Sequence, residues 1–385
     1  MIPAEIDIAV IGGGIVGMCA ALDLAAEGQG VLVLDDGRHS GTTANAGSLH
    51  VQMQSRFLRL YPDQVPGLEA SLPLYVAAAR LWAQMAVDLG TDFELRASGG
   101  LMVAEDAAAL GFLAAKCARE AALGLRVHML DRAELARIAP YLGPAVIGAE
   151  LCEDEGKLNP LLANQAVRRA ALAHGVLHAA ETPVTMLAPS GAGWRLETPR
   201  GAVRAGRVLL AAGAGTGALA AMVGLRVPTV AEPLHMNVTE ATAPLIGHLV
   251  QHAERMITMK QLAAGQVVIG GGWPARLAGG SGQPQVEATS LFGNLGLAQH
   301  LVPRVGRLRL IRSWAGVNTT ADGQCILGPA PGRDNLFFAV PGDAGYTLGP
   351  LVGRMAAAAM LGREPGFDLA RFSAARFAQP QSSAA

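Results

Sequence analysis

Three glycines near the N-terminus have the spacing of a dinucleotide-binding turn. Gly12, Gly14 and Gly17 follow the apolar run 6–11, and a second apolar run, 31–34, ends at Asp35. The first glycine of such a turn lets the chain bend tightly, the second lets the backbone approach a pyrophosphate, and the third lets the helix pack on the sheet. The helix N-terminus then offers N–H groups to the phosphates, and the Asp35 carboxylate can bind a ribose diol. The unit predicts an ADP-containing dinucleotide, and a glycine-rich turn in an unrelated α/β protein is the alternative.

The segment that follows Asp35 has the composition of a ligand-wrapping loop. Residues 36–49 are mostly small, hydroxyl-bearing or glycine. Such residues let a backbone approach a ligand closely, although the composition alone slightly favours an ordinary surface loop.

Composition excludes several classes of protein. The chain has 385 residues, a net charge of −1, 51% hydrophobic residues and a mean hydropathy of +0.32. This balance gives no electrostatic basis for binding nucleic acid or an anionic membrane. The four cysteines are far apart, so we expect no zinc or iron–sulfur site in this chain. No apolar run is long enough to span a membrane, and the first strand begins too early for a signal peptide, so we expect a soluble, cytoplasmic protein.

The order of predicted elements indicates a discontinuous nucleotide-binding domain. A strand–helix–strand unit opens the chain, antiparallel strand patterns fill the middle, and buried-strand and helix patterns return at the end. Helices are predicted at 68–89, 104–123, 131–138, 159–174, 291–301 and 351–361. Strands are predicted as a pair within 93–103 and at 146–152, 176–187 (interrupted by Pro183), 207–212, 227–238, 255–262, 266–271, 308–315 and 336–340, with a separate hairpin at 194–198 and 202–205.

Further blocks of the sequence resemble one enzyme family. Besides the opening unit, these blocks are Ser40–Leu49, Asp154–Pro160, Val208–Gly215, Trp314–Gly328 and Gly342–Pro350. In this order they resemble the D-amino-acid-oxidase-like flavoproteins, which include glycine oxidase, sarcosine oxidase and D-amino acid dehydrogenase. The resemblance covers nearly the whole chain and implies non-covalently bound FAD. It also implies an α/β (α+β) fold, with a Rossmann-like FAD-binding domain and an inserted antiparallel-sheet substrate domain.

The resemblance places the domain boundaries and the cofactor contacts. We expect an FAD-binding domain at 1–67, 145–222 and 323–377, a substrate-binding domain at 68–144 and 223–322, and a disordered tail at 378–385. Gly342–Pro350 would be a flavin loop. The expected cofactor contacts are Gly12, Gly14, Ile15, Val16, Gly17, Asp35, Asp36, Ser40, Thr42, Thr43, Asn45, Ala46, Gly47, Ser48, Leu49, Val184, Ala212, Gly213, Gly316, Ala344, Gly345, Tyr346 and Thr347.

One segment carries a closer resemblance. Residues 42–57, TTANAGSLHVQMQSRF, resemble the β subunits of opine (octopine/nopaline) oxidases and D-hydroxyproline dehydrogenases. That resemblance implies a catalytic β subunit working with an alpha subunit and a small ferredoxin-like [2Fe–2S] subunit. The iron–sulfur cluster would then belong only to a partner. The protein would be cytoplasmic or attached peripherally to the inner membrane through its electron acceptor.

The substrate side departs from the family pattern at two positions. Asn318 stands where many members have a substrate-binding arginine, and Asp343-Ala344-Gly345 replaces a frequent Gly-His-Gly. We therefore do not expect the usual carboxylate clamp, and we expect a roomier pocket beside the flavin, which points towards a larger substrate such as an opine. Candidate catalytic residues are His50, Lys260, Asn318, Asp343 and Tyr346, and candidate substrate-binding residues are Arg56, Met259 and Arg312. Each also has an ordinary explanation in packing, capping or a salt bridge.

The implied reaction is oxidation of a C–N bond by hydride transfer to flavin N5, followed by hydrolysis of the imine. A flavin enzyme of this kind needs no side-chain base if the amine arrives deprotonated. We expect a dehydrogenase for a secondary-amine amino acid, with a D-opine favoured. The alternatives are a cis-4-hydroxy-D-proline or D-amino acid dehydrogenase, a stand-alone D-amino acid or glycine oxidase, a non-catalytic flavoprotein subunit, and an NAD-linked enzyme.

Overall fold

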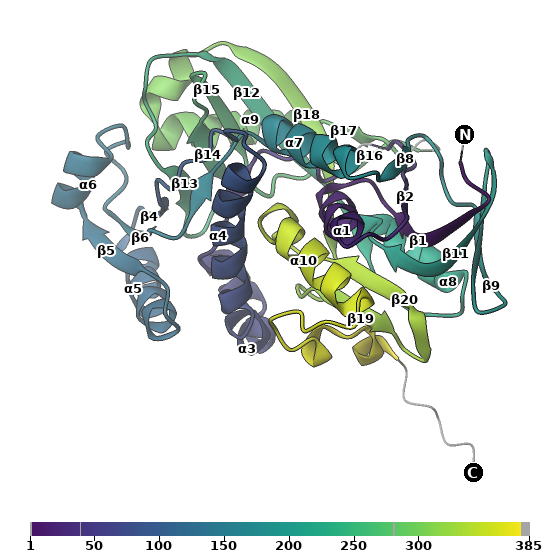
Figure 1. The fold of residues 1–385 in the computed structure, drawn as a ribbon. Coiled ribbons are helices and arrows are strands. Elements are labelled where there is room, and N and C mark those ends of the chain that lie inside the picture. Colours follow the sequence, from purple (N-terminus) through teal and green to yellow (C-terminus); the bar gives the residue numbers. More distant parts are fainter. Residues whose placement is uncertain (1, 39, 280–281, 379–385) are drawn as a thin grey trace. The chain divides into compact units, whose positions relative to one another are not determined.

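The computed structural model describes residues 2–38, 40–279 and 282–378 (Figure 1). The chain divides into two compact units. The first comprises Met1–Thr42, Asn164–Ala231 and Asn318–Ala385, and the second comprises Thr43–Ala163 and Glu232–Val317. The chain passes from one unit to the other after Thr42 and within three regular elements: helix α7 (Pro160–Ala173), strand β12 (Val230–Ala241) and strand β18 (Leu310–Thr320).

The first unit is built on a mostly parallel sheet. Its strand order in the described residues is β19-β20-β11-β1-β2-β8, with β10 and β9 added at one side. The strands are β1 (Glu5–Ile11), β2 (Val31–Leu34), β8 (Leu177–Ala179), β9 (Met186–Ser190), β10 (Gly193–Thr198), β11 (Gly201–Leu210), β19 (Ile326–Ala330) and β20 (Arg333–Val340). Residues 8–11 of β1 are all buried, as expected for a parallel strand covered on both faces.

Helices α1 (Ile15–Ala26) and α10 (Gly345–Met360) pack side by side in the first unit (Figure 1). Two glycines of α10 permit the close approach: a Cβ at Gly353 would lie 2.5 Å from the carbonyl oxygen of Val16, and one at Gly349 would lie 2.7 Å from the Ile15 side chain. The unit also contains α8 (Thr216–Ala221), the 3-10 turns Gly213–Gly215, Ala370–Phe372 and Ala374–Phe377, and most of α7.

The second unit is built on a mostly antiparallel sheet. Its order in the described residues is β18-β12-β15-β14-β13-β4-β6-β5, and β13 and β4 pair in parallel. The strands not yet given are β4 (Gly100–Ala104), β5 (Val127–Asp131), β6 (Gly148–Cys152), β13 (Leu249–His252), β14 (Thr258–Gln261) and β15 (Gln266–Gly270). Two small ribbons pair β3 (Ser48–Leu49) with β7 (Gly156–Lys157) and β16 (Arg276–Leu277) with β17 (Pro284–Gln285).

The two faces of this second sheet differ in chemistry. Directly paired residues lie on the same face, so Met259 lies with Val250 and Ile269 in the apolar core, to which α9 contributes Leu297. The neighbouring residue Lys260 belongs to the opposite face. Besides α9 (Ala288–Leu301), the unit contains α2 (Ser55–Leu60), α3 (Val65–Glu69), α4 (Leu72–Asp88), α5 (Ala107–Ala122), α6 (Arg132–Ile138) and the 3-10 turns Pro62–Gln64 and Pro303–Arg307.

The predicted α/β fold class is confirmed, and three local predictions were wrong. The expected strand pair within 93–103 is only β4, because Glu94 and Gly99 have positive φ and bend the preceding segment. The hairpin strand at 202–205 and the strand at 207–212 form one continuous strand, β11. The expected flavin loop at 342–350 is mostly the first turn and a half of α10, which begins at Gly345 and contains Pro350.

The compact units have different boundaries from the predicted domains. Residues 43–67 and 145–163 group with the second unit, and residues 223–231 and 318–322 group with the first. The segment predicted to pass beside the flavin groups with the second unit because its strand β3 pairs with β7 there. The predicted disordered tail lies outside the described residues except for Ala378.

Candidate active site

The glycine turn in the first unit has no room for side chains. Gly12 has φ +117°, and a Cβ there would lie 2.3 Å from the carbonyl oxygen of Ala211. A Cβ at Gly17 would lie 2.0 Å from the carbonyl oxygen of Gly12, and one at Gly14 would lie 3.0 Å from Oγ1 of Thr42. Gly14 caps α1 without a side-chain hydrogen bond of its own, and Thr42 takes the N–H of Ile15. The other N–H groups of the first turn have no partner within the helix and are the ones left for a ligand.

Asp35 is held against this turn by two backbone groups. Its Oδ2 accepts a hydrogen bond of 2.6 Å from Gly13 N, and its Oδ1 accepts one of 2.7 Å from Gly37 N. Gly13 was not among the predicted cofactor residues, although a Cβ there would strike the Asp35 carboxylate. The contacts fix the carboxylate at the carboxyl end of β2, the place where a ribose diol is bound in this kind of unit.

A series of hydrogen bonds links Thr42, Asn164 and Tyr346 in the first unit. Thr42 accepts from Ile15 N at the start of α1 (3.0 Å), and its carbonyl accepts from the side chain of Asn164 (3.2 Å). The Asn164 oxygen accepts from the hydroxyl of Tyr346 (2.9 Å). Asn164 escaped sequence reasoning because it lies inside an ordinary helical pattern. Burial raises the pKa of Tyr346 well above its usual value, so its hydroxyl stays protonated and donates.

The first unit also contains the remaining predicted contacts of the nucleotide half. Val184 and Ala212 pack against the apolar core, Gly213 has φ +53°, and Asp36 is exposed, with its Oδ1 accepting from Arg38 N. Ala344, Gly345 and Thr347 stand at the N-terminus of α10, and Val16 lies in the first turn of α1. Ser40 belongs to the same unit.

The predicted flavin-side segment of the second unit is anchored at several points. Asn45 accepts from Gly47 N (2.6 Å), and Gly47 has φ +77°, where a Cβ would lie 2.2 Å from the carbonyl oxygen of Leu158. Trp314 donates from Nε1 to the carbonyl of Ala44 (2.9 Å), and a Cβ at Gly316 would lie 2.3 Å from the Ala44 side chain. The predicted contacts within this unit are Thr43, Asn45, Ala46, Gly47, Ser48, Leu49 and Gly316.

Lys260 reaches this segment from β14. The residue is 1% exposed, and its Nζ donates to Oγ of Ser48 at 2.8 Å. Within the described part of the chain, no carboxylate lies within ion-pair distance of this ammonium. Burial, and then the charge of Lys157, lower the pKa of Lys260 well below its usual value. This burial places Lys260 beneath Ser48 and favours a supporting role over direct substrate contact.

His50 follows the same segment and is partly open to solvent. Its side chain is 26% exposed, and Nδ1 lies 3.8 Å from Oε1 of Glu155. Burial and the nearby charge of Lys260 lower the pKa of His50 to about 4, although a hydrogen bond with Gln251 acts in the opposite direction. The imidazole is therefore neutral at physiological pH.

The other candidates of the second unit occupy different environments. Arg56 is exposed on α2, and no carboxylate pairs with it in the described residues. Arg312 is exposed on β18, with its guanidinium 5.9 Å from the ring centroid of Trp314. Met259 is 0% exposed in the apolar core on the opposite face of the sheet from Lys260. The structure therefore does not bring Met259 together with the other candidates.

Asn318 and Asp343 lie in the first unit. Asn318 is half-buried on β18, and Asp343 is exposed in the turn before α10.

Sequence reasoning also overlooked Glu155, which is fully buried directly beside the predicted His50 segment. Its only sequence signal is an acidic residue in a short Gly-flanked turn, and such residues are usually exposed.

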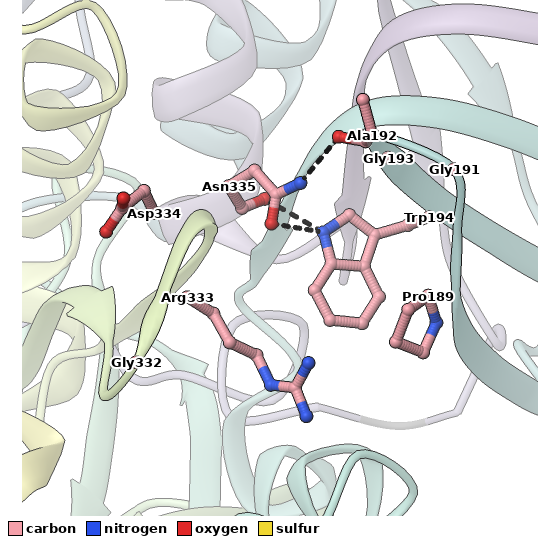
Figure 2. Close-up of a pocket in the computed structure, with 9 residues that line it drawn as sticks. All are labelled: Pro189, Gly191, Ala192, Gly193, Trp194, Gly332, Arg333, Asp334 and Asn335. Carbon is pink, nitrogen blue, oxygen red and sulfur yellow. Dashed lines mark hydrogen bonds between the residues drawn. The ribbon is translucent and has the colours of Figure 1, made fainter.

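A surface depression of the first unit is unrelated to these residues. Figure 2 shows it between the β9–β10 turn and the β19–β20 turn, with Trp194 donating from Nε1 to the backbone and side-chain oxygens of Asn335. Asn335 in turn donates to Ala192. None of the predicted site residues lines this depression.

The chain's groups fit FAD at the nucleotide end. The close approach at Gly12, the first-turn N–H groups of α1 and the fixed Asp35 carboxylate provide the contacts that a pyrophosphate and a ribose require. In the described residues, no group of three or more His, Cys, Asp or Glu is arranged to hold a metal ion. No helix among those residues has the length and apolar character needed to cross a bilayer.

Comparisons with known proteins agree with this geometry. A family model described as DAO, FAD dependent oxidoreductase, matches residues 7–359. An opine oxidase subunit from Rhizobium meliloti is 29% identical over 397 residues, covering 98% of this chain and 99% of that protein. Glycine oxidase of Geobacillus kaustophilus (strain HTA426) is 26% identical over 373 residues, covering 96% and 97%. The crystal structure of glycine oxidase from Geobacillus kaustophilus has a TM-score of 0.86 at 25% identity, covering 98% and 100%. The chain is therefore a member of the DAO family of FAD-dependent oxidoreductases and acts on amino acids.

Proposed function

We propose that this protein oxidises the C–N bond of a secondary-amine amino acid, with a D-opine such as octopine or nopaline as the favoured substrate. The observation that carries the proposal is Asn318, which stands where many family members have a substrate-binding arginine. The full-length similarity to an opine oxidase component supports the same substrate class. FAD supplies the two-electron acceptor for the hydride that leaves the carbon beside nitrogen, and water then hydrolyses the imine.

The side chains bind and orient the amine in this proposal. A neutral His50 does not repel a substrate ammonium, and its imidazole accepts a hydrogen bond from the substrate N–H. Its low pKa makes it a weak base, so we assign it to orientation rather than to proton removal. The exposed guanidiniums of Arg56 and Arg312 are cations of the second unit that are available to substrate carboxylates.

We also propose that the chain works as the catalytic subunit of a heteromeric complex. Its relatives include proteins named as subunits of opine oxidase and of sarcosine oxidase. The partners in the proposal are an alpha subunit and a small ferredoxin-like [2Fe–2S] subunit that carry electrons away. Co-purification of the tagged chain with its native partners, followed by iron analysis of each separated subunit, tests this part.

Anaerobic bleaching of the flavin absorbance near 450 nm tests the substrate class. The holoprotein, alone and in its intact complex, is mixed with octopine, nopaline, cis-4-hydroxy-D-proline, D-proline, sarcosine and glycine. We expect the opines to bleach the flavin fastest. Faster bleaching by cis-4-hydroxy-D-proline or D-proline moves the substrate to the cyclic imino acids, and no bleaching by any secondary amine contradicts the proposal.

A stand-alone oxidase is the second candidate. The full-length match to glycine oxidase in sequence and fold favours it. Under this alternative the isolated chain consumes oxygen with glycine or a D-amino acid as fast as it reduces a dye acceptor. Slow oxygen consumption with fast dye reduction supports the dehydrogenase.

A further inference from the structure

A fully buried carboxylate holds the segment that carries His50. Glu155 is 0% exposed, and its Oε1 accepts hydrogen bonds from Val51 N (2.8 Å) and Gln52 N (3.1 Å). Its Oε2 accepts from the side-chain amides of Gln52 (2.9 Å) and Gln251 (2.7 Å). From the turn before β7, the Glu155 carboxylate thus binds two other parts of the second unit: the 51–52 segment and strand β13.

Such an arrangement is costly unless the ionised form is well bonded. Burial raises the pKa of Glu155 to about 7, while the four N–H donors and the Lys116 charge stabilise the carboxylate. If this buried carboxylate were removed, each N–H group that donates to it would be left without another acceptor. The Glu155 side chain therefore determines where residues 51 and 52 lie.

A second buried cluster extends the network from Gln52 inward. Lys116 donates to Oε1 of Gln52 (3.2 Å), to Glu120 (2.9 Å) and to Glu150 (2.6 Å), and Glu120 accepts from Met53 N. The charged residues of this cluster are each at most 2% exposed. The backbone of residues 51–53 is consequently bonded to α5 through Glu120 and to the turn before β7 through Glu155, and Lys116 links this cluster to β6 through Glu150.

The outer end of the network is presented at the surface of the second unit. Gln251 accepts from Nε2 of Gln54 at 2.6 Å, and Gln54 is exposed. His50, with a partly exposed side chain, stands at the other end of the same short segment. The hydrogen-bond directions run one way, since Gln54 donates to Gln251 and Gln251 donates to Glu155.

We propose that Glu155 is a positioning residue for amine oxidation, which fixes His50 and the Gln54–Gln251 pair in the orientation that binds the substrate amine and carboxylate. The inference rests on the proposed function, in which the segment after the predicted flavin contacts faces the substrate. Glu155 itself touches neither substrate nor cofactor in this scheme and acts only through residues 50–54 and 251.

Glu155→Gln is the sharpest test because it preserves size and removes one acceptor oxygen. The new side-chain amide would place N–H groups against the donor amides of Gln52 and Gln251. If the Gln251 amide rotated to accept from it, Gln251 would lose the hydrogen bond that it accepts from Gln54. We expect the limiting rate of anaerobic flavin reduction to fall about 10- to 100-fold, with the substrate dissociation constant changed less than about threefold. Glu155→Asp, which keeps the charge on a shorter stem, should recover part of this rate.

Two further variants keep the test decisive. Glu153→Gln makes the same chemical change two residues away on an exposed side chain paired with Arg126, and should match the wild type. Gln54→Ala removes only the exposed end of the network, so it folds even if Glu155→Gln does not, and should slow flavin reduction about fivefold to tenfold. Wild-type reduction rates in both Glu155→Gln and Gln54→Ala would overturn the inference.

Hydrogen–deuterium exchange separates this inference from the proposed function. Without any substrate, the amides of residues 51–53 should exchange faster in Glu155→Gln than in the wild type, while those of β4 should be unchanged. If no amine bleaches the wild-type flavin, the proposed function fails and the exchange result alone decides whether Glu155 fixes the segment. Unchanged exchange at 51–53 would overturn the positioning role.

Discussion

Nζ of Lys260 and Oγ of Ser48 lie 2.8 Å apart, and this contact joins the second unit's sheet to its predicted flavin-side segment. Both side chains are buried, and no carboxylate in the described residues pairs with the lysine. The same ammonium contributes to the low pKa of His50. Lys260 thus connects two of the predicted site residues while contacting solvent hardly at all.

Lys260→Met should separate these two effects. Losing the bond to Ser48 should weaken FAD binding up to about tenfold, because an intramolecular hydrogen bond contributes about 0.5–1.5 kcal/mol. Removing the positive charge should raise the pKa of His50 from about 4 towards its usual value, measured by NMR titration of the imidazole. Ser48→Ala is the matched control, since it should weaken FAD binding and leave the His50 titration unchanged. A substrate KM that rises with unaltered FAD affinity would instead support a direct carboxylate clamp.

Gly12→Ala should abolish FAD binding. The new Cβ would lie 2.3 Å from the carbonyl oxygen of Ala211, and φ +117° is strained for any L-residue. The purified variant should lack the 450 nm absorbance and melt at a lower temperature. Gly175→Ala is the control, because φ there is +88° but no heavy atom lies within 4 Å of the added Cβ. It should cost about 1 kcal/mol and retain FAD; a flavin-loaded Gly12→Ala protein would contradict the assignment of the turn.

Asp35→Ala should weaken FAD binding about 10- to 100-fold. The substitution removes the acceptor for the ribose and for Gly13 N and Gly37 N, which are charge-assisted contacts. Fluorescence titration of the apoprotein with FAD measures the loss. Asp7→Ala breaks a comparable carboxylate contact, from Gly30 N at 2.8 Å, elsewhere in the first unit. Equal FAD affinities for the two variants would remove Asp35 from the cofactor site.

The opening motif and the fold class could be read from sequence because both depend on local patterns. Gly12 and Gly17 must be glycine for steric reasons, and residues 8–11 of β1 and all of β2 are continuous apolar runs of the kind that parallel strands require. The helix predicted at 131–138 is confirmed as α6, and it begins with a capping box in which Asp131 and Glu134 make both reciprocal hydrogen bonds.

The interior of the second unit could not be read in this way. Glu155 and Lys116 are charged residues whose burial depends on partners far away in sequence, including Gln251, which is 96 residues after Glu155. The strand predicted at 255–262 correctly included Lys260, but the sequence could not tell a solvent-facing lysine from one buried against Ser48. The flavin loop predicted at 342–350 became part of α10 because tertiary packing against α1 overrides the helix-breaking tendency of its glycines and Pro350.

The buried carboxyls should make the protein less stable as pH rises. Burial raises the pKa of Glu150 to about 9 and that of Glu155 to about 7, both above the value of an unfolded chain. Between about pH 4.5 and these values, the folded protein holds protons that the unfolded chain releases, so the free energy of unfolding falls with increasing pH. The slope reaches at most about 1.4 kcal/mol per pH unit for each proton.

Glu150→Gln isolates one of these contributions. The amide resembles the protonated acid and cannot ionise, so the variant should lose less stability than the wild type between pH 5 and pH 9 in urea-unfolding titrations. Glu153→Gln, which alters an exposed carboxylate, should follow the wild-type curve. A Glu150→Gln curve parallel to the wild type across this range would mean that Glu150 is ionised in the folded protein.

Asn318→Arg should move substrate preference towards small amino acids. The change restores the arginine that resembles the family's carboxylate clamp, and a bidentate Arg–carboxylate contact favours a substrate whose carboxylate lies close to the reacting carbon. We expect the kcat/KM ratio of glycine or D-alanine to octopine to rise about 10- to 100-fold, with the larger substrate losing part of its room. Asn318→Gln is the control, since it adds length without charge and should leave the ratio nearly unchanged. The ratio is measured by dye reduction at pH 8 for both substrates, and an unaltered value in Asn318→Arg would show that position 318 does not select the substrate.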